Sequence, residues 1–127
     1  MGATFLRTAH YPNHLYTYLL ADRLGLAAAA EIPVWQFTEN EFRAQAGRRV
    51  ADQMWREMIL ANHNRPSLIF WSTNNEARHL PQRITFNRRL IRDFRRHLQD
   101  NRIVIQSAAA DRVGPRDASQ QDFLIPG

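Results

Sequence analysis

The clearest indication of the fold comes from residues 64–76, Asn64-Arg65-Pro66-Ser67-Leu68-Ile69-Phe70-Trp71-Ser72-Thr73-Asn74-Asn75-Glu76. Residues 68–71 are apolar at successive positions, which is typical of a strand covered on both faces of a parallel sheet. Amides and a carboxylate follow this strand at once, and ligands in parallel α/β folds bind beyond the carboxyl ends of the strands. The stretch therefore predicts a buried strand with a site at its end. A single Glu in this position also suits the start of a helix.

Apolar runs on both sides of this stretch alternate with helical patterns, which is the order of βα units. We predict strands at residues 3–8, 26–32, 68–72, 103–107 and 123–125. The second run holds four alanines, which also suit a helix, but Gly25 closes the helix before it and Pro33 follows it. The chain thus predicts an α/β fold with parallel strands, and a loop at residues 108–121.

Three longer segments have helical periodicity. The first runs over residues 13–24 with Asn13 as its cap, and the second over 38–62 with Thr38 and Glu41 at the spacing of a capping box. The third begins near Pro81 and continues to residue 98. The side chains that we expect to face the core are Leu15, Leu19 and Leu20 in the first, Phe42, Ala46, Val50, Met54 and Met58 in the second, and Ile84, Ile91, Phe94 and Leu98 in the third.

The composition limits the classes of protein to which the chain can belong. Its 127 residues are the length of one domain, 44% of them are hydrophobic, and no run approaches the roughly 18 apolar residues of a membrane span. The first ten residues lack the pattern of a secretory signal, so we expect a cytoplasmic location and no membrane partner. The chain has no cysteine, which excludes disulfides and thiol catalysis.

Arginine accounts for the positive charge. All 17 basic residues are Arg, and eight of them lie between Arg78 and Arg102. Such a cluster is one way to build a nucleic-acid surface, but these residues also fall on the solvent side of the third predicted helix, and no recognition motif accompanies them. We therefore expect no nucleic-acid partner, and an arginine-rich nucleic-acid binder is only our third hypothesis.

Three ordered motifs carry a resemblance to a known family. Residues 7–12, RTAHYP, resemble a segment R-x-x-H-Y-P, while residues 22–26, DRLGL, and 31–35, EIPVW, resemble D-x-L-G-L and D-E-I-P stretches. The pattern N-H-P-S, apolar strand, W-S-x-x-N-E is matched by Asn64, Pro66, Ser67, Trp71, Ser72, Asn75 and Glu76. These motifs, in this order, resemble the catalytic domain of family 2 glycoside hydrolases. The resemblance implies a partial (β/α)8 TIM barrel over residues 1–127, about strands two to five or six of eight.

The resemblance also implies an activity, that of a retaining β-glycosidase of the β-galactosidase or β-glucuronidase type. Such enzymes use two carboxyl groups about 5–5.5 Å apart. Carried over to this chain, Glu76 is the acid/base and Asn75 binds the sugar 2-hydroxyl. Arg7 faces the nucleophile and keeps it ionised, and His10 lines the sugar pocket or is a hydrogen-bonded structural histidine. Glu31 either contacts sugar or pairs with a nearby Arg. A β-glycoside is the implied ligand, and we expect neither a metal nor a cofactor.

Some positions depart from the family pattern, and one essential group has no counterpart. Asn74 replaces Gly or Ala, Arg65 replaces His, Ala61–Asn62 replaces Arg-Asp, and Ala30 replaces Asp. We expect each of these changes to remove a polar or steric feature near the site. The family carries its nucleophile on the seventh barrel strand in a segment like T-E-Y-G, which has no match here. After Asp100 the only carboxylates are Asp111, Asp117 and Asp122, and none of them follows an apolar strand.

Without a nucleophile the isolated chain is expected to be inactive. The alternative to an enzyme segment is a non-catalytic remnant or complementing fragment that binds carbohydrate or a partner chain. In both cases an open barrel exposes strand edges, so we expect the rest of the barrel or a second copy of the chain as a partner.

Overall fold

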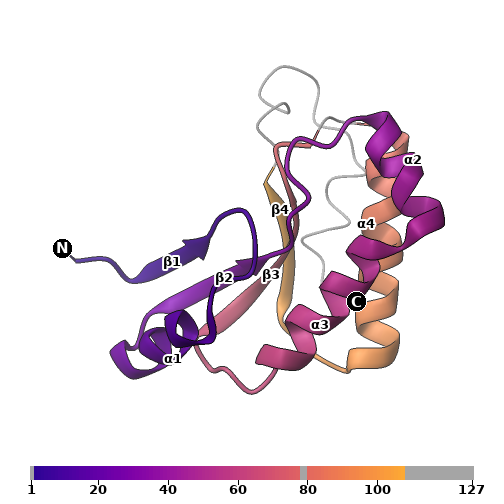
Figure 1. Cartoon of the computed structure of the whole chain (residues 1–127). Helices are drawn as coiled ribbons and strands as arrows, with labels where there is room; N and C mark the ends of the chain where they lie inside the picture. Colours follow the sequence, from indigo (N-terminus) through magenta and orange to yellow (C-terminus); the bar gives the residue numbers. More distant parts are fainter. Residues whose placement is uncertain (1, 78–79, 108–127) are drawn as a thin grey trace.

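The computed structural model describes residues 2–77 and 80–107 as a parallel sheet with helices packed against it (Figure 1). The strands lie in chain order, β1-β2-β3-β4, and each pair is parallel. The elements are β1 (Phe5–Thr8), α1 (Leu15–Leu24), β2 (Ala27–Glu31), α2 (Glu39–Arg48), α3 (Val50–Asn62), β3 (Leu68–Asn75), α4 (Pro81–Asp93), the π-helical turn η1 (Phe94–Leu98) and β4 (Ile103–Ser107). The predicted α/β fold is confirmed, and consecutive parallel strands joined by helices are the arrangement of a TIM barrel. The loop predicted at 108–121 and the strand at 123–125 lie outside the described residues.

The core lies between the sheet and the helices. Side chains that alternate along the strands point into it, among them Ala28, Ala30 and Trp71, and meet Trp55 and Phe86 from the helices. In Figure 1, α2, α3 and α4 stand together beside β3 and β4, whereas α1 lies near β1 and β2. The sheet is therefore covered on one face by its own helices, as in one sector of a barrel wall.

The opposite face of the sheet has no such cover within the described residues. Phe5 and Ile103 lie on it and are 45% and 49% exposed. Phe5 makes an edge contact with Phe70, at 5.8 Å between ring centroids. In a closed barrel this face is the interior, where layers of side chains from the other strands fill the space.

The predicted helix over residues 38–62 is wrong as a single element. Arg49 adopts a left-handed backbone, φ 56°, which ends α2 and starts α3, and the Gln45 side chain accepts from the Ala51 N–H at 2.9 Å. The capping box of Thr38 and Glu41 is confirmed. Because the break rotates α3, its buried face is offset from the predicted stripe. The buried residues of α2 and α3 are Phe42, Ala51, Trp55, Met58, Ile59 and Asn62, while Ala46, Val50 and Met54 are exposed.

Helix α1 also differs from the prediction, because its cap is His14 and not Asn13. The His14 ring accepts from the Tyr16 N–H at 3.3 Å, and the Asn13 N–H instead donates to the Tyr18 hydroxyl at 3.0 Å. That hydroxyl also lies 3.4 Å from Thr8 Oγ1, so the polar end of a buried Tyr18 fixes how the helix is rotated. Tyr18 and Ala21 are therefore the buried positions, whereas the predicted core residues Leu15 and Leu20 are exposed.

Helix α4 buries polar as well as apolar side chains. Of the residues predicted to face the core from α4 and from η1, which follows it, Phe94 in η1 is buried, while Ile84, Ile91 and Leu98 are only half-buried. Asn87 takes a central position because its amide accepts from Asn74 at 2.9 Å and donates to Gln106 at 2.8 Å, which turns this face of the helix toward β3 and β4. The fully packed positions of α4 are Arg83, Phe86, Asn87 and Leu90.

Asp22 on α1 ties this helix to the segment before β3. Its carboxylate accepts from the Ser67 N–H at 2.9 Å and from Arg65 at 3.4 Å. Burial raises the pKa of Asp22, but the hydrogen bonds from Ser67 and Arg65 outweigh it, so the pKa lies below its usual value. Two motif residues, Asp22 and Ser67, thus have a structural role in joining consecutive units.

We expect Asp22→Asn to lower the free energy of unfolding by about 1–2 kcal/mol at neutral pH, because it removes a charged acceptor. A carboxyl whose folded pKa is lowered stabilises the fold above its unfolded pKa, about 3.9, and this contribution is lost as the pH falls through the folded value. Urea unfolding of both proteins between neutral pH and about pH 2.5 should therefore show the difference shrinking in acid. A difference that is constant with pH would contradict this role for the carboxylate.

Candidate active site

Polar side chains from three strands meet at the carboxyl edge of the sheet. Arg7 is near the end of β1, Glu31 ends β2, and Ser72 and Asn75 belong to β3, which is longer than the predicted strand and includes Asn75. Because the strands are parallel and adjacent, their carboxyl ends bring these positions together. We call Arg7, His10, Glu31, Ser72 and Asn75 the polar cluster.

Glu31 is the centre of the polar cluster. Its carboxylate is fully buried and lies 2.7 Å from Arg7 Nη2, 3.1 Å from His10 Nδ1 and 2.6 Å from the Ser72 hydroxyl, which donates to it. A buried carboxylate is tolerated when such donors satisfy its oxygens. Of the two interpretations of Glu31, the structure supports the pairing with an arginine.

Arg7 connects Glu31 with the amide of Asn75. Its Nη2 also donates to Asn75 Oδ1 at 2.6 Å, which fixes the orientation of that amide. Asn75 is buried, and its Nδ2 has no partner among the described residues. An amide donor that is held in place and left unpaired is suited to a ligand oxygen.

Glu76 follows Asn75 at the rim of the polar cluster. It is half-buried, with a left-handed backbone, φ 51°, and its N–H donates to the Ser107 carbonyl at 2.7 Å. Its carboxylate accepts from Gln36 Nε2 at 3.1 Å. Gln36 has a left-handed backbone too, φ 53°, and its N–H donates to the Asn75 carbonyl at 2.9 Å. Gln36, in the segment after β2, therefore orients the Glu76 carboxylate, which follows β3.

His10 is held from two sides. Its Nδ1 is bound to Glu31, and its ring is stacked on Trp35 with 6.0 Å between centroids and 15° between planes. Beside this pair lies a hollow of about 480 Å³, which we call the aromatic hollow, lined by His10, Tyr11, Pro33, Trp35 and Phe37. His10 thus has the hydrogen bond that is expected of a structural histidine. It also lines a cavity next to the polar cluster.

The sequence did not single out Gln36, Ser72 or Trp35 as site residues. Ser72 belongs to the W-S motif, and its position on the same side of β3 as Phe70 is the signal that places it beside Glu31. Gln36 and Trp35 follow the E-I-P motif, beyond the carboxyl end of a strand, where ligand-binding residues of this architecture gather. The contacts of Gln36 with Glu76 and of Trp35 with His10 depend on the path of the loop. The periodicity of apolar residues does not predict that path.

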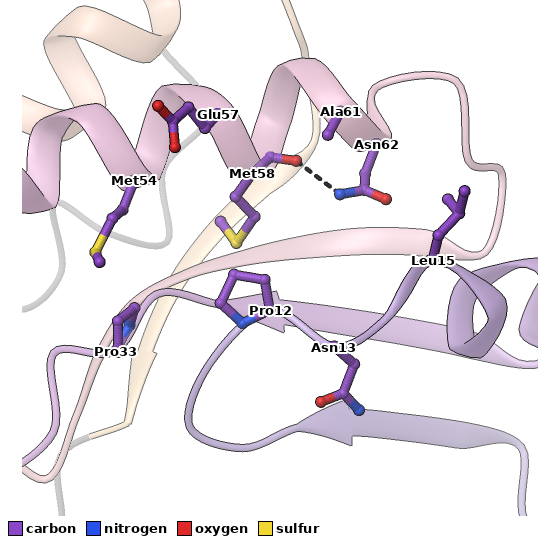
Figure 2. Close-up of a pocket in the computed structure, with 9 residues that line it drawn as sticks. All are labelled: Pro12, Asn13, Leu15, Pro33, Met54, Glu57, Met58, Ala61 and Asn62. Carbon is purple, nitrogen blue, oxygen red and sulfur yellow. Dashed lines mark hydrogen bonds between the residues drawn. The ribbon is translucent and has the colours of Figure 1, made fainter.

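The expectation that the motif departures lie near the site is wrong. Asn74 points to α4, where it bonds Asn87, and Arg65 pairs with Asp22. Ala30 is buried in the core beneath the helices. Ala61 and Asn62 line a separate hollow between α3 and the segment after β1, and the Asn62 amide donates to the Met58 carbonyl of its own helix (Figure 2). Asn74, Arg65, Ala30 and Asn62 thus contact helices or the core and not the polar cluster.

Within residues 2–77 and 80–107, no helix has the length and hydrophobicity that a membrane span requires. No group of three or more His, Asp or Glu side chains in this part has the arrangement of a metal site.

Parallel βα units that collect an arginine, a buried carboxylate, an amide and a further carboxylate at one edge define a TIM-barrel protein with a polar site at the carboxyl ends of its strands. The family can be named, because the sequence profile described as "Glycosyl hydrolases family 2, TIM barrel domain" matches residues 1–117. This chain belongs to that family.

Individual relatives agree with this assignment. A beta-galactosidase of Thermoanaerobacterium thermosulfurigenes is 40% identical over 73 residues, which are 57% of this chain and 10% of that protein. A putative beta-glucuronidase of Formosa agariphila is 37% identical over 81 residues, which are 64% of this chain and 10% of that protein. The chain thus spans about a tenth of the length of these curated relatives.

Solved structures show the same fold. A beta-D-glucuronidase of Dictyoglomus thermophilum superposes with a TM-score of 0.70 at 32% identity, over 83% of this chain and 20% of that one. A beta-galacturonidase of Eisenbergiella tayi, bound to galacturonate, has a TM-score of 0.78 at 24% identity, over 86% and 20% of the two chains, and supports the fold alone. The described residues correspond to one sector of such a barrel, and the resemblance inferred from the motifs is confirmed.

Proposed function

We propose that this chain supplies the acid/base side of the active site of a retaining β-glycosidase that acts on a β-galactoside or β-glucuronide. The observation that supports this most is the assembly of Arg7, Glu31 and Asn75 into one hydrogen-bonded cluster with Glu76 at its rim. These side chains come from three different strands and meet at the edge where barrel enzymes bind their substrates.

In this proposal Glu76 protonates the glycosidic oxygen as the bond breaks and later removes a proton from the attacking water. The bond from Gln36 engages Oε2, so Oε1 is the oxygen that carries the proton. Half-burial supports the role, since a carboxyl at a partly solvated rim can both meet a substrate and exchange its proton with water.

Asn75 positions the sugar. Its Oδ1 is engaged by Arg7, so the amide is oriented with Nδ2 as the donor for the 2-hydroxyl. A hydrogen bond to this hydroxyl strengthens in the transition state and contributes several kcal/mol in such enzymes. Arg7 has two roles here: it fixes Asn75 directly, and its positive charge favours the ionised form of a nucleophile brought close to it.

The nucleophile comes from strands that are not among these four. We propose that strands carrying it cover the exposed face with Phe5 and Ile103, because apolar side chains on an uncovered sheet face are stabilised by burial. The same face favours the complementing-fragment hypothesis, which requires docking of a partner chain but no turnover. We call the assembly of these 127 residues with the remaining strands of the barrel, including those that carry the nucleophile, the completed barrel. The experiment that tests the proposed function is hydrolysis of a leaving-group series by the completed barrel with and without Glu76→Gln.

We expect Gln36→Gly in the completed barrel to lower kcat about tenfold, or about 1.4 kcal/mol in the barrier, with little change in KM. The change removes the amide that orients Glu76, while glycine suits the left-handed backbone at this position. Steady-state kinetics on a nitrophenyl glycoside measure both constants. A matched control is Gln53→Ala on α3, where Gln53 donates to Glu57 at 2.7 Å away from the polar cluster. Equal kinetics for both variants would contradict the role of Gln36.

A further inference from the structure

We propose that Ser72 is a positioning residue, whose hydroxyl sets the orientation of the Asn75 amide through Glu31 and Arg7. The inference rests on the proposed function, because it takes the Asn75 amide as the donor to the sugar 2-hydroxyl. Ser72 is fully buried, so it acts on the sugar only through other side chains. Three hydrogen bonds make this connection, from Ser72 to Glu31, from Arg7 to Glu31 and from Arg7 to Asn75.

Strand β3 is irregular at the end that carries Asn75. Between Ser72 and Asn75 it has one residue more than its neighbour, because three steps along β3 match two steps along β4. In a regular strand, where side chains alternate, Asn74 would share the face of Ser72. Here Asn74 instead bonds Asn87 on α4, and Asn75 joins Ser72 in the polar cluster. An extra residue of this kind re-aims a side chain, but it also interrupts the ladder that would hold it.

The backbone of Asn75 has other supports, whereas its side chain depends on Arg7. The Asn75 N–H donates to the Val34 carbonyl at 2.9 Å, and its carbonyl accepts from the Gln36 N–H at 2.9 Å. Neither bond limits rotation of the side-chain amide. Within the part of the chain that the structure describes, this amide has one partner, Arg7 Nη2, which lies 2.6 Å from Oδ1. The direction of Nδ2 thus follows the position of the guanidinium.

The guanidinium of Arg7 is held by Glu31, and Glu31 is held by Ser72. The Ser72 hydroxyl and Arg7 Nη2 both donate to Oε2 of Glu31, at 2.6 Å and 2.7 Å. Glu31 and Ser72 are partners in the register of adjacent strands, so the ladder fixes this donor opposite the carboxylate. The terminal torsion of a glutamate has a broad energy minimum. Without the Ser72 donor the carboxylate can turn and carry Arg7 with it.

The three bonds therefore connect the regular part of β3 with its irregular end. Ser72 lies before the extra residue and Asn75 after it, so the side chains replace the positional control that the ladder loses there. A hydrogen bond to the sugar 2-hydroxyl strengthens in the transition state. A misdirected amide should for this reason lower kcat more than it raises KM.

The experiment measures Ser72→Ala in the completed barrel on a nitrophenyl glycoside and on its 2-deoxy counterpart, which has no hydroxyl for Asn75 to bind. We expect kcat to fall about fivefold on the ordinary glycoside and less than about twofold on the 2-deoxy glycoside, with little change in KM. The change removes one oxygen and leaves Oε2 of Glu31 with its bond to Arg7, so the fold is retained.

Two further variants separate positioning from a general structural effect. In the Asn75→Ala background, Ser72→Ala should cause no further loss, because residues that act through one another are not additive. The matched control is Ser67→Ala, since Ser67 is also a buried serine, whose hydroxyl donates to the Tyr18 carbonyl at 3.5 Å outside the polar cluster. Ser67→Ala should affect both substrates equally.

Equal losses on the two substrates in Ser72→Ala, or an undiminished loss in the Asn75→Ala background, would overturn the inference. A leaving-group dependence that Glu76→Gln changes would still leave the proposed function standing. The opposite failure is recognised by NMR of the side-chain amides in the 127-residue chain itself. The Asn75 signal, identified by its absence in Asn75→Ala, should broaden in Ser72→Ala, because the amide then samples more than one orientation, and should stay unchanged in Ser67→Ala.

An Asn75 signal that Ser72→Ala leaves unchanged would overturn the inference whether or not the completed barrel turns over. If the signal broadens but no glycoside is cleaved, the proposed function is wrong and the connection from Ser72 to Asn75 stands.

Discussion

Glu76→Gln in the completed barrel is expected to lose about 10²- to 10⁴-fold in kcat/KM on glycosides with poor leaving groups, such as methyl or another sugar. The amide has nearly the same shape as the carboxyl but has no proton to give, so a poor leaving group departs as an unstabilised alkoxide. Dinitrophenyl glycosides should keep most of their rate in the first step, because their leaving group needs little protonation. Steady-state rates over a leaving-group series measure this difference.

The control for this prediction is Glu57→Gln on α3. Glu57 also accepts a hydrogen bond from a glutamine side chain, Gln53, but it lies on the helix side of the sheet. It should therefore leave the leaving-group dependence unchanged. Equal losses across the series for Glu76→Gln would show that Glu76 acts on binding or folding and not as an acid.

The second large effect is all-or-none: the 127-residue chain alone should not turn over nitrophenyl β-galactoside or β-glucuronide. Mixing it with the remaining strands of the barrel should produce turnover. Retaining hydrolysis needs a nucleophile on the opposite face of the sugar from the acid, and proton donation by Glu76 alone is worth only about 10²- to 10⁴-fold. The added strands would also bury the face with Phe5 and Ile103.

A variant of the chain tests whether such turnover depends on that face. Ile103→Asp places a charge where the added strands would pack, so it should abolish complementation while leaving the helix side of the sheet intact. Turnover by the chain alone that is lost in Glu76→Gln would contradict the requirement for a second carboxylate from outside these residues. Turnover by the mixture that Ile103→Asp does not change would contradict docking on this face.

The sequence could predict the strand order and the meeting of Arg7, His10, Asn75 and Glu76, because both follow from parallel strands whose carboxyl ends share one edge. Apolar runs bounded by Gly and Pro identify the strands, and residues that follow them must gather there. The structural or sugar-binding role of Glu31 could not be decided in this way. Its three donors come from residues 7, 10 and 72, and their distances depend on side-chain rotamers and on the register between strands.

Helix faces were the weakest sequence predictions. A single left-handed residue, Arg49, divides the predicted second helix, and no Gly or Pro at that position signals the break. In α1, Tyr18 and not the leucines faces the core, because its hydroxyl has two partners in the loop and strand before it. In α4 the amide contacts of Asn87 displace Ile84 and Ile91 from the centre of the core. In each case a tertiary hydrogen bond or a left-handed backbone residue, and not the apolar periodicity, determines which face of the helix is buried.

Rescue by azide tests whether Glu76 is the acid/base of a retaining β-glycosidase. When the completed barrel with Glu76→Ala acts on a dinitrophenyl glycoside, a covalent intermediate should form quickly. This intermediate should then accumulate, because the base that activates water for its hydrolysis has been removed. Azide needs no base and fits the space left by the carboxylate, so it should accelerate turnover and give a glycosyl azide in which the β configuration is retained. No acceleration by azide, with water remaining the only acceptor, would contradict the assignment of Glu76.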